Sequence, residues 1–100
     1  MNKIKKYVDD IAEELDGAKH YIETALEYKA MNDSERYSTY KSMSLSEIDH
    51  ANKLHQFAVQ DIEKLKSVYP DIPQKMLDKW DHAHVEYVEK TAWIKQMQNM

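Results

Sequence analysis

The chain of 100 residues fits a single domain, and its net charge of −4, with acids and bases interspersed, offers no basic surface for nucleic acid. Cysteine is absent, which excludes disulfides and thiolate chemistry, and no apolar run approaches the roughly 20 residues of a membrane span or forms a signal segment. We therefore expect a cytoplasmic protein. One Gly and two Pro favour long helices and an all-α fold.

The first predicted helix covers about residues 3–30. Its apolar residues alternate at spacings of four and three, which is the period of one helix face. This face consists of Ile4, Val8, Ile11, Leu15, Ala18, Ile22, Ala25 and Leu26. A second row, spaced by sevens, borders it and consists of Tyr7, Glu14, Tyr21 and Tyr28. Because Glu14 replaces an aromatic residue in a row beside the core, it is a candidate functional side chain.

The second predicted helix covers about residues 33–67. Asn32, followed by Glu35, predicts an N-cap with a capping box at its start. At about 100° per residue, Glu47 falls near the middle of the inward face and His50 on its flank. The inward row is Tyr37, Tyr40, Ser44, Glu47, Ile48, Ala51, Leu54, His55, Ala58, Ile62 and Leu65.

The third predicted helix covers about residues 73–98, because Pro70 ends the second helix and Pro73 suits a first turn. The short connections predict an antiparallel three-helix bundle built on a helical hairpin. The inward face of the third helix is Met76, Leu77, Trp80, Ala83, His84, Tyr87, Thr91 and Ile94. Counted from the Pro70–Pro73 turn, His84 lies level with His55, which predicts a hydrogen-bonded core pair.

Heights along the hairpin bring three chemically active side chains together. Glu14 lies 18 residues before the turn at Asn32, whereas Glu47 and His50 lie 15 and 18 residues after it. At about 1.5 Å per residue the three lie within roughly 5 Å in height. Two acids and an imidazole converging in an apolar interior need a counter-charge, which a divalent metal ion supplies. Gly17, one turn after Glu14, could leave room for a ligand, a water or a partner helix, or could be merely tolerated.

Two stretches carry a family resemblance. The stretch Glu13-Glu14-Leu15-Asp16-Gly17-Ala18-Lys19-His20-Tyr21 resembles the first metal helix of rubrerythrin-type ferritin-like proteins. The stretch Ser46-Glu47-Ile48-Asp49-His50-Ala51-Asn52-Lys53-Leu54 resembles their second-helix Glu-x-x-His motif. Order and spacing also resemble the small encapsulated ferritins, over about residues 8–58. The whole chain, with its Trp80-Asp81-x-x-His84 segment, resembles small phage-encoded helical proteins of unassigned role.

The resemblance to ferritin-like proteins implies that Glu14, Glu47 and His50 are ligands of iron or manganese, with Glu47 able to bridge two ions and Tyr21 nearby. It implies a homodimer or larger homo-oligomer, because one chain supplies half of the family's di-metal site. Bound iron would support ferroxidase-like oxidation of Fe(II) by O₂, although turnover itself is not predicted.

The chain departs from the family in its third helix, where Asp81-x-x-His84 stands in place of a second Glu-x-x-His. His55, Asp81 and His84 are lower-ranked metal ligands, and the site could be mononuclear, vestigial or absent. Without a metal, Glu47 would be a buried acid bonded to Tyr or His, and Glu14 a solvated edge acid. The alternative function is a non-catalytic structural or interaction module that binds a protein partner through an apolar strip left uncovered by three helices.

Overall fold

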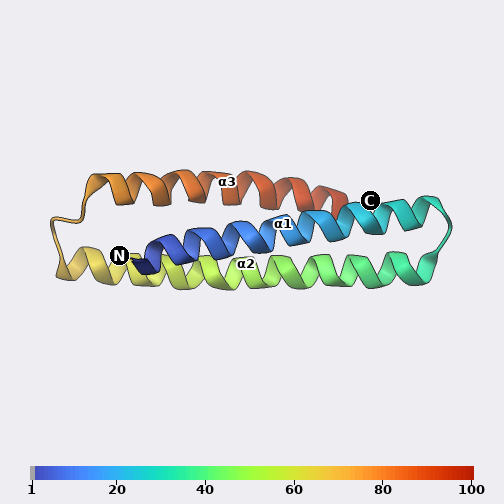
Figure 1. Ribbon diagram of the computed structural model, residues 1–100, viewed down its shortest axis with the longest axis horizontal. Helices are drawn as coiled ribbons and strands as arrows, with labels where there is room; N and C mark the ends of the chain where they lie inside the picture. The colour runs from blue at the N-terminus through green and yellow to red at the C-terminus, as the bar shows by residue number, and fades with distance from the viewer. Residues whose placement is uncertain (1) are drawn as a thin grey trace.

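The computed structural model describes residues 2–100, and the side chains of residues 3–100, as three helices: α1 (Asn2–Ala30), α2 (Ser34–Val68) and α3 (Gln74–Gln98) (Figure 1). Every helix begins and ends within one residue of its predicted position, so the all-α, antiparallel three-helix architecture is confirmed. The molecule is a rod with extents of 56 × 18 × 16 Å. Within residues 2–100, no helix combines the length and apolarity needed to cross a membrane.

The turn between α1 and α2 corrects the predicted N-cap. Asn32 adopts a left-handed backbone with φ of 60°, which its short polar side chain tolerates. The cap is the next residue, Asp33, whose carboxylate accepts a hydrogen bond from the backbone N–H of Arg36 at 3.1 Å. The Arg36 guanidinium adds an ion pair to the same carboxylate at 2.7 Å. The predicted capping box of Asn32 with Glu35 is therefore wrong by one residue.

The core lies along the α1–α2 hairpin, and small side chains bring these two helices close together. Ala18 and Ala25 of α1, with Ala51 and Ala58 of α2, are completely buried. Larger apolar side chains fill the space around them. These buried residues are Ile4, Ile11, Leu15, Ile22, Ile48, Ile62, Trp80 and Ile94.

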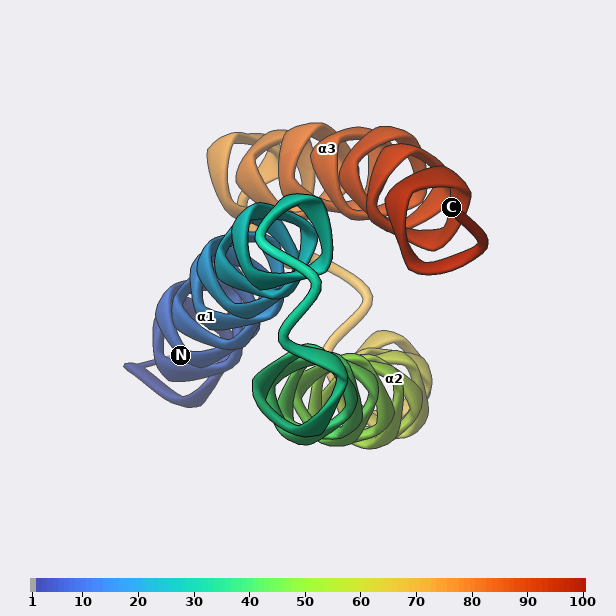
Figure 2. The same ribbon diagram turned by 90° about the vertical axis from the view of Figure 1, so that its right-hand side faces the viewer.

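Helix α3 runs antiparallel to α2 and makes more of its contacts with α1 than with α2 (Figures 1 and 2). Trp80 and Ile94 are its buried apolar residues. Near its C-terminal end, Gln98 donates a hydrogen bond to the Ser44 hydroxyl at 2.9 Å, and Ser44 donates to the Ala18 carbonyl at 2.7 Å. This buried polar chain joins all three helices at one level. The open side of the hairpin, away from α3, carries the candidate site.

Candidate metal centre

Three side chains from α1 and α2 converge as the heights along the hairpin predict. Glu14, Glu47 and His50 each offer one ligand atom, and these atoms all lie within 4.8 Å of one another. The His50 Nδ1 atom is 3.5 Å from Glu14 Oε2 and 3.9 Å from Glu47 Oε1. We call these three residues the carboxylate–histidine cluster. Within residues 3–100 no other group of three such ligands comes this close together.

Helix periodicity explains why the cluster forms on the side of the hairpin away from α3. On α2, His50 is about 140° around the helix axis from His55, which contacts α3. On α1, the row that contains Glu14 runs along the seam with α2. Tyr7, in the same row, donates a hydrogen bond to Asp61 at 2.8 Å. The spacing by sevens therefore positions Glu14 against α2.

The cluster lies at the rim of the hairpin and not in the apolar interior that the sequence suggested. The Glu14 and Glu47 side chains are 27% and 25% exposed, and the His50 side chain is 59% exposed. Because α3 packs on the other side of the hairpin, none of the helices within residues 2–100 closes over the cluster. The two acids are partly desolvated, while the imidazole is open to solvent.

Crowding of negative charge alters the acid–base behaviour of Glu47. Its pKa is raised first by hydrogen bonding with the Glu14 carboxyl, then by partial burial and by repulsion from the Glu14 charge. Glu13 adds to this repulsion, whereas a charged His50 acts in the opposite direction. The carboxyl pair thus favours holding a positive charge between its oxygens, either a proton or a metal cation.

Gly17 has a defined role at this site. A Cβ atom at Gly17 would lie 3.1 Å from Glu47 Oε2, closer than ordinary van der Waals contact. The missing side chain therefore makes room for the Glu47 carboxylate itself, rather than for a water or a partner helix. The sequence already pointed to a role for Gly17, because a glycine inside a helix costs roughly 1 kcal/mol relative to alanine.

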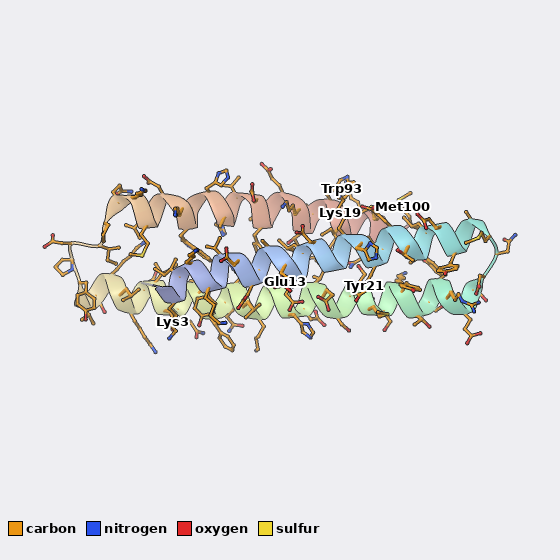
Figure 3. All side chains as sticks on the ribbon, viewed as in Figure 1. Lys3, Glu13, Lys19, Tyr21, Trp93 and Met100 are labelled. Atoms are coloured by element: carbon orange, nitrogen blue, oxygen red, sulfur yellow. The ribbon has the colours of Figure 1, made fainter. Side chains whose placement is uncertain are left out.

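Tyr21 lies on α1 between the cluster and the α1–α2 turn. Figure 3 shows it closer to this turn than Glu13, the neighbour of Glu14. Its ring lies 6.2 Å from that of Tyr40, which also stacks on Tyr28 at 5.6 Å. These aromatic rings continue the seam that contains Glu14. The Tyr21 ring contacts those of Tyr40 and His20, so Tyr21 contributes packing beside the cluster.

His55 and His84 form an imidazole–imidazole contact between α2 and α3. His55 Nε2 and His84 Nδ1 are 2.8 Å apart, which confirms the predicted hydrogen bond. The predicted core location of His84 is wrong, because its side chain is exposed at the edge of α3. Asp81 is also exposed, and among the described residues it forms no three-ligand group with this pair. We call His55 and His84 the histidine pair.

Two polar contacts of α3 could not be predicted from the sequence. Gln98 is buried against Ser44, and Tyr87 donates a hydrogen bond to Asn52. The helix period predicts that Tyr87 faces inward, but the local pattern does not identify Asn52 as its partner. The buried Gln98 lies in the last turn, where the apolar period of the helix fades and gives no signal.

Comparisons with protein-family models, with curated proteins and with solved structures find no match to this chain. Two carboxylates and one imidazole form a mixed oxygen and nitrogen donor set, of the kind that divalent first-row metal ions accept. The chain is a three-helix, all-α protein with a candidate carboxylate–histidine metal centre on its α1–α2 hairpin.

Proposed function

We propose that this protein is a ferritin-like metal-binding protein whose carboxylate–histidine cluster binds iron or manganese. The observation that carries the proposal is the approach of three ligand atoms from two helices to within 4.8 Å, beside a glycine that leaves space for one of the carboxylates. Carboxylate oxygens suit Mn²⁺ and imidazole suits Fe²⁺, and both ions tolerate mixed sets of these ligands. A divalent cation would also remove the repulsion between Glu14 and Glu47.

A second copy of the chain is proposed to complete the centre. Three ligands leave coordination positions open, and ferritin-like di-metal sites draw ligands from four helices. Exposure around His50 supports this arrangement. Met43 and Phe57, seven residues before and after His50, lie on the same stripe of α2 and are 37% and 42% exposed. Two hairpins facing each other across a two-fold axis would bury these side chains and bring two clusters together.

Ferroxidase-like activity is the catalytic form of this proposal. Iron bound at the cluster would supply the redox chemistry for the oxidation of Fe(II) by O₂. The residues of the chain would hold the ion and compensate its charge, and the ion would offset the repulsion from Glu14 that helps to raise the pKa of Glu47.

Metal analysis of protein purified without chelator tests the proposal. Wild-type protein should contain stoichiometric iron or manganese, and Glu47→Ala should lose it while keeping its helical content. Glu86→Ala is the matched control, because Glu86 pairs with His82 on the exposed face of α3, away from the cluster. Absence of metal from the wild type after reconstitution with Fe²⁺ or Mn²⁺ would refute metal binding. Light scattering tests whether a second copy of the chain completes the centre, since a strict monomer in the metal-loaded state would exclude a shared centre.

The second candidate is a non-catalytic interaction module, which exposed apolar residues on α3 favour. Val85 and Val88 lie about one turn apart and are 52% and 50% exposed. A protein partner could cover this strip, because adjacent apolar side chains on a helix surface often mark an interface. Metal-free wild-type protein, together with unchanged folding of Glu47→Ala, would favour this candidate.

A further inference from the structure

The histidine pair brings two imidazole nitrogens from different helices into direct contact. His55 of α2 and His84 of α3 direct ring nitrogens at each other across 2.8 Å, and their rings stack with centroids 5.0 Å apart. Tyr87 stacks on His55 with centroids 4.1 Å apart, and Trp80 lies 5.3 Å from His55. The aromatic neighbours therefore fix the ring of His55, while the exposed ring of His84 can adjust.

The environment of His55 favours a neutral imidazole, which is the form that binds metal. Burial lowers the pKa of His55, and the nearby His84 lowers it further. The charged residues that line the small cavity beside His55 are Glu86 and Lys90 of α3, which carry opposite charges. The pair therefore differs from the carboxylate–histidine cluster, where two acids dominate.

We propose that His55 and His84 form a separate binding site for a divalent ion of the Zn²⁺ and Cu²⁺ class, which bridges α2 and α3. Such ions accept neutral imidazole ligands readily. With bonds of about 2.0–2.1 Å in a tetrahedral arrangement, the two nitrogens would be roughly 3.3 Å apart. A small rotation of the exposed His84 ring supplies this opening, and water fills the remaining positions. This site does not depend on the function proposed for the cluster.

The bound ion would link the two helices that have the fewest contacts with each other. Helix α3 packs mainly against α1 and has its fewest contacts with α2. An ion between His55 and His84 would add a direct link between α2 and α3 about midway along α3. Binding to the folded chain alone would stabilise the docked position of α3 by mass action.

Quenching of Trp80 fluorescence by Cu²⁺ tests the site, because a Cu²⁺ ion on His55 would lie close to the Trp80 ring. Trp93→Phe provides a background in which Trp80 is the remaining tryptophan. This variant should show saturable quenching that Zn²⁺ reverses by competition. Adding His84→Ala should abolish the quenching. Adding His82→Ala, which removes an exposed histidine of the same helix, should leave it unchanged.

Two further variants make the result decisive. Glu47→Gln in the same background should retain the quenching, which separates this site from the carboxylate–histidine cluster. If His84→Ala loses helical content, His84→Gln keeps a hydrogen-bonding amide beside His55 and should lose the quenching in the same way. Absence of saturable quenching in Trp93→Phe, or equal quenching after loss of His84, would overturn the proposal.

Discussion

The hairpin carries an imidazole on each of two opposite sides, and the two sites differ in what surrounds the ring. On the side away from α3, His50 faces two carboxylates, and the pKa of Glu47 is raised by its proximity to Glu14. On the side towards α3, His55 faces another imidazole, and burial lowers its pKa. The first environment favours a bound cation, and the second favours a neutral imidazole at His55. Neighbouring groups, rather than residue type, therefore determine the chemistry that each histidine can support.

The two sides also differ in what they contribute to folding. The side towards α3 is joined by buried side chains such as Ile94 and by the Gln98–Ser44 hydrogen bond. The side away from α3 is a partly exposed seam, where the carboxylates of Glu14 and Glu47 repel each other. Substitutions towards α3 should change stability and leave the cluster intact. Substitutions at the cluster should change metal binding with small effects on folding.

Truncation of the α3 core should have the largest effect on stability. Ile94 is 1% exposed, so Ile94→Ala removes buried methyl groups and leaves a cavity. We expect a loss of about 2–5 kcal/mol in the free energy of unfolding, measured by urea denaturation. Metal binding by the folded protein should persist, because α1 and α2 alone supply the cluster. Val88→Ala, on the exposed face, should change the free energy by less than about 0.5 kcal/mol. Loss of metal binding by folded Ile94→Ala would show that the two sides are not independent.

Removal of the polar link should have the next largest effect. Ser44→Ala deletes the hydroxyl that accepts from Gln98 and donates to Ala18. The Gln98 amide would then be buried without that acceptor, at a cost of about 1–3 kcal/mol. The double variant Ser44→Ala with Gln98→Leu removes both polar groups and should recover part of the loss. A double variant as unstable as Ser44→Ala would mean that the cost lies elsewhere.

The sequence was sufficient for the architecture because helix period and chain breakers act locally. The alternating spacing of apolar residues and the two prolines located the three helices within one residue. The height of Glu14 relative to Glu47 and His50 followed from helix rise and one short turn. Sequence could not locate the cap between Asn32 and Asp33, because either residue caps a helix well and the left-handed turn decides between them.

The solvent exposure of side chains was less predictable from the sequence than the position of the helices. His84 falls on the inward face by helix period, yet its side chain is exposed. The amount of cover depends on the angle and distance at which α3 docks, and no local pattern encodes them. The same limitation applies to the cluster, which the sequence suggested was interior and the structure shows at the rim. The role of Gly17 also required coordinates, because its nearest neighbour belongs to another helix.

Substitution of Gly17 should change stability and metal affinity in opposite directions. Gly17→Ala raises helix propensity by about 1 kcal/mol, and the new Cβ meets the end of the flexible Glu47 side chain rather than backbone. We therefore expect a net gain in the free energy of unfolding of up to about 1 kcal/mol for the metal-free protein. The displaced carboxylate should bind Mn²⁺ more weakly, as measured by isothermal titration calorimetry. Equal affinity for Mn²⁺ in both proteins would exclude Glu47 as a ligand in the position described.

Neutralising Glu47 should have the smallest effect on folding and a characteristic pH dependence. Its folded-state pKa is raised by Glu14 and by partial burial, so its contribution to stability is fully present below the ordinary Glu pKa. That contribution is lost as the pH rises through the raised value. Glu47→Gln cannot ionise, so the metal-free variant should exceed the wild type in stability at neutral pH. The gain should be up to about 1 kcal/mol, because the side chain is partly exposed.

The comparison is made by urea denaturation of chelator-treated protein across the acidic to neutral range. The two proteins should have the same stability in acid, where Glu47 is protonated, and diverge as the pH rises. Mn²⁺ should then reverse their order at neutral pH, because a ligand that binds the folded wild type stabilises it by mass action. If Glu47→Gln is the less stable protein at neutral pH without metal, the carboxylate makes a favourable contact in the apo state. Repulsion from Glu14 would then not be the force that prepares this side of the hairpin for a cation.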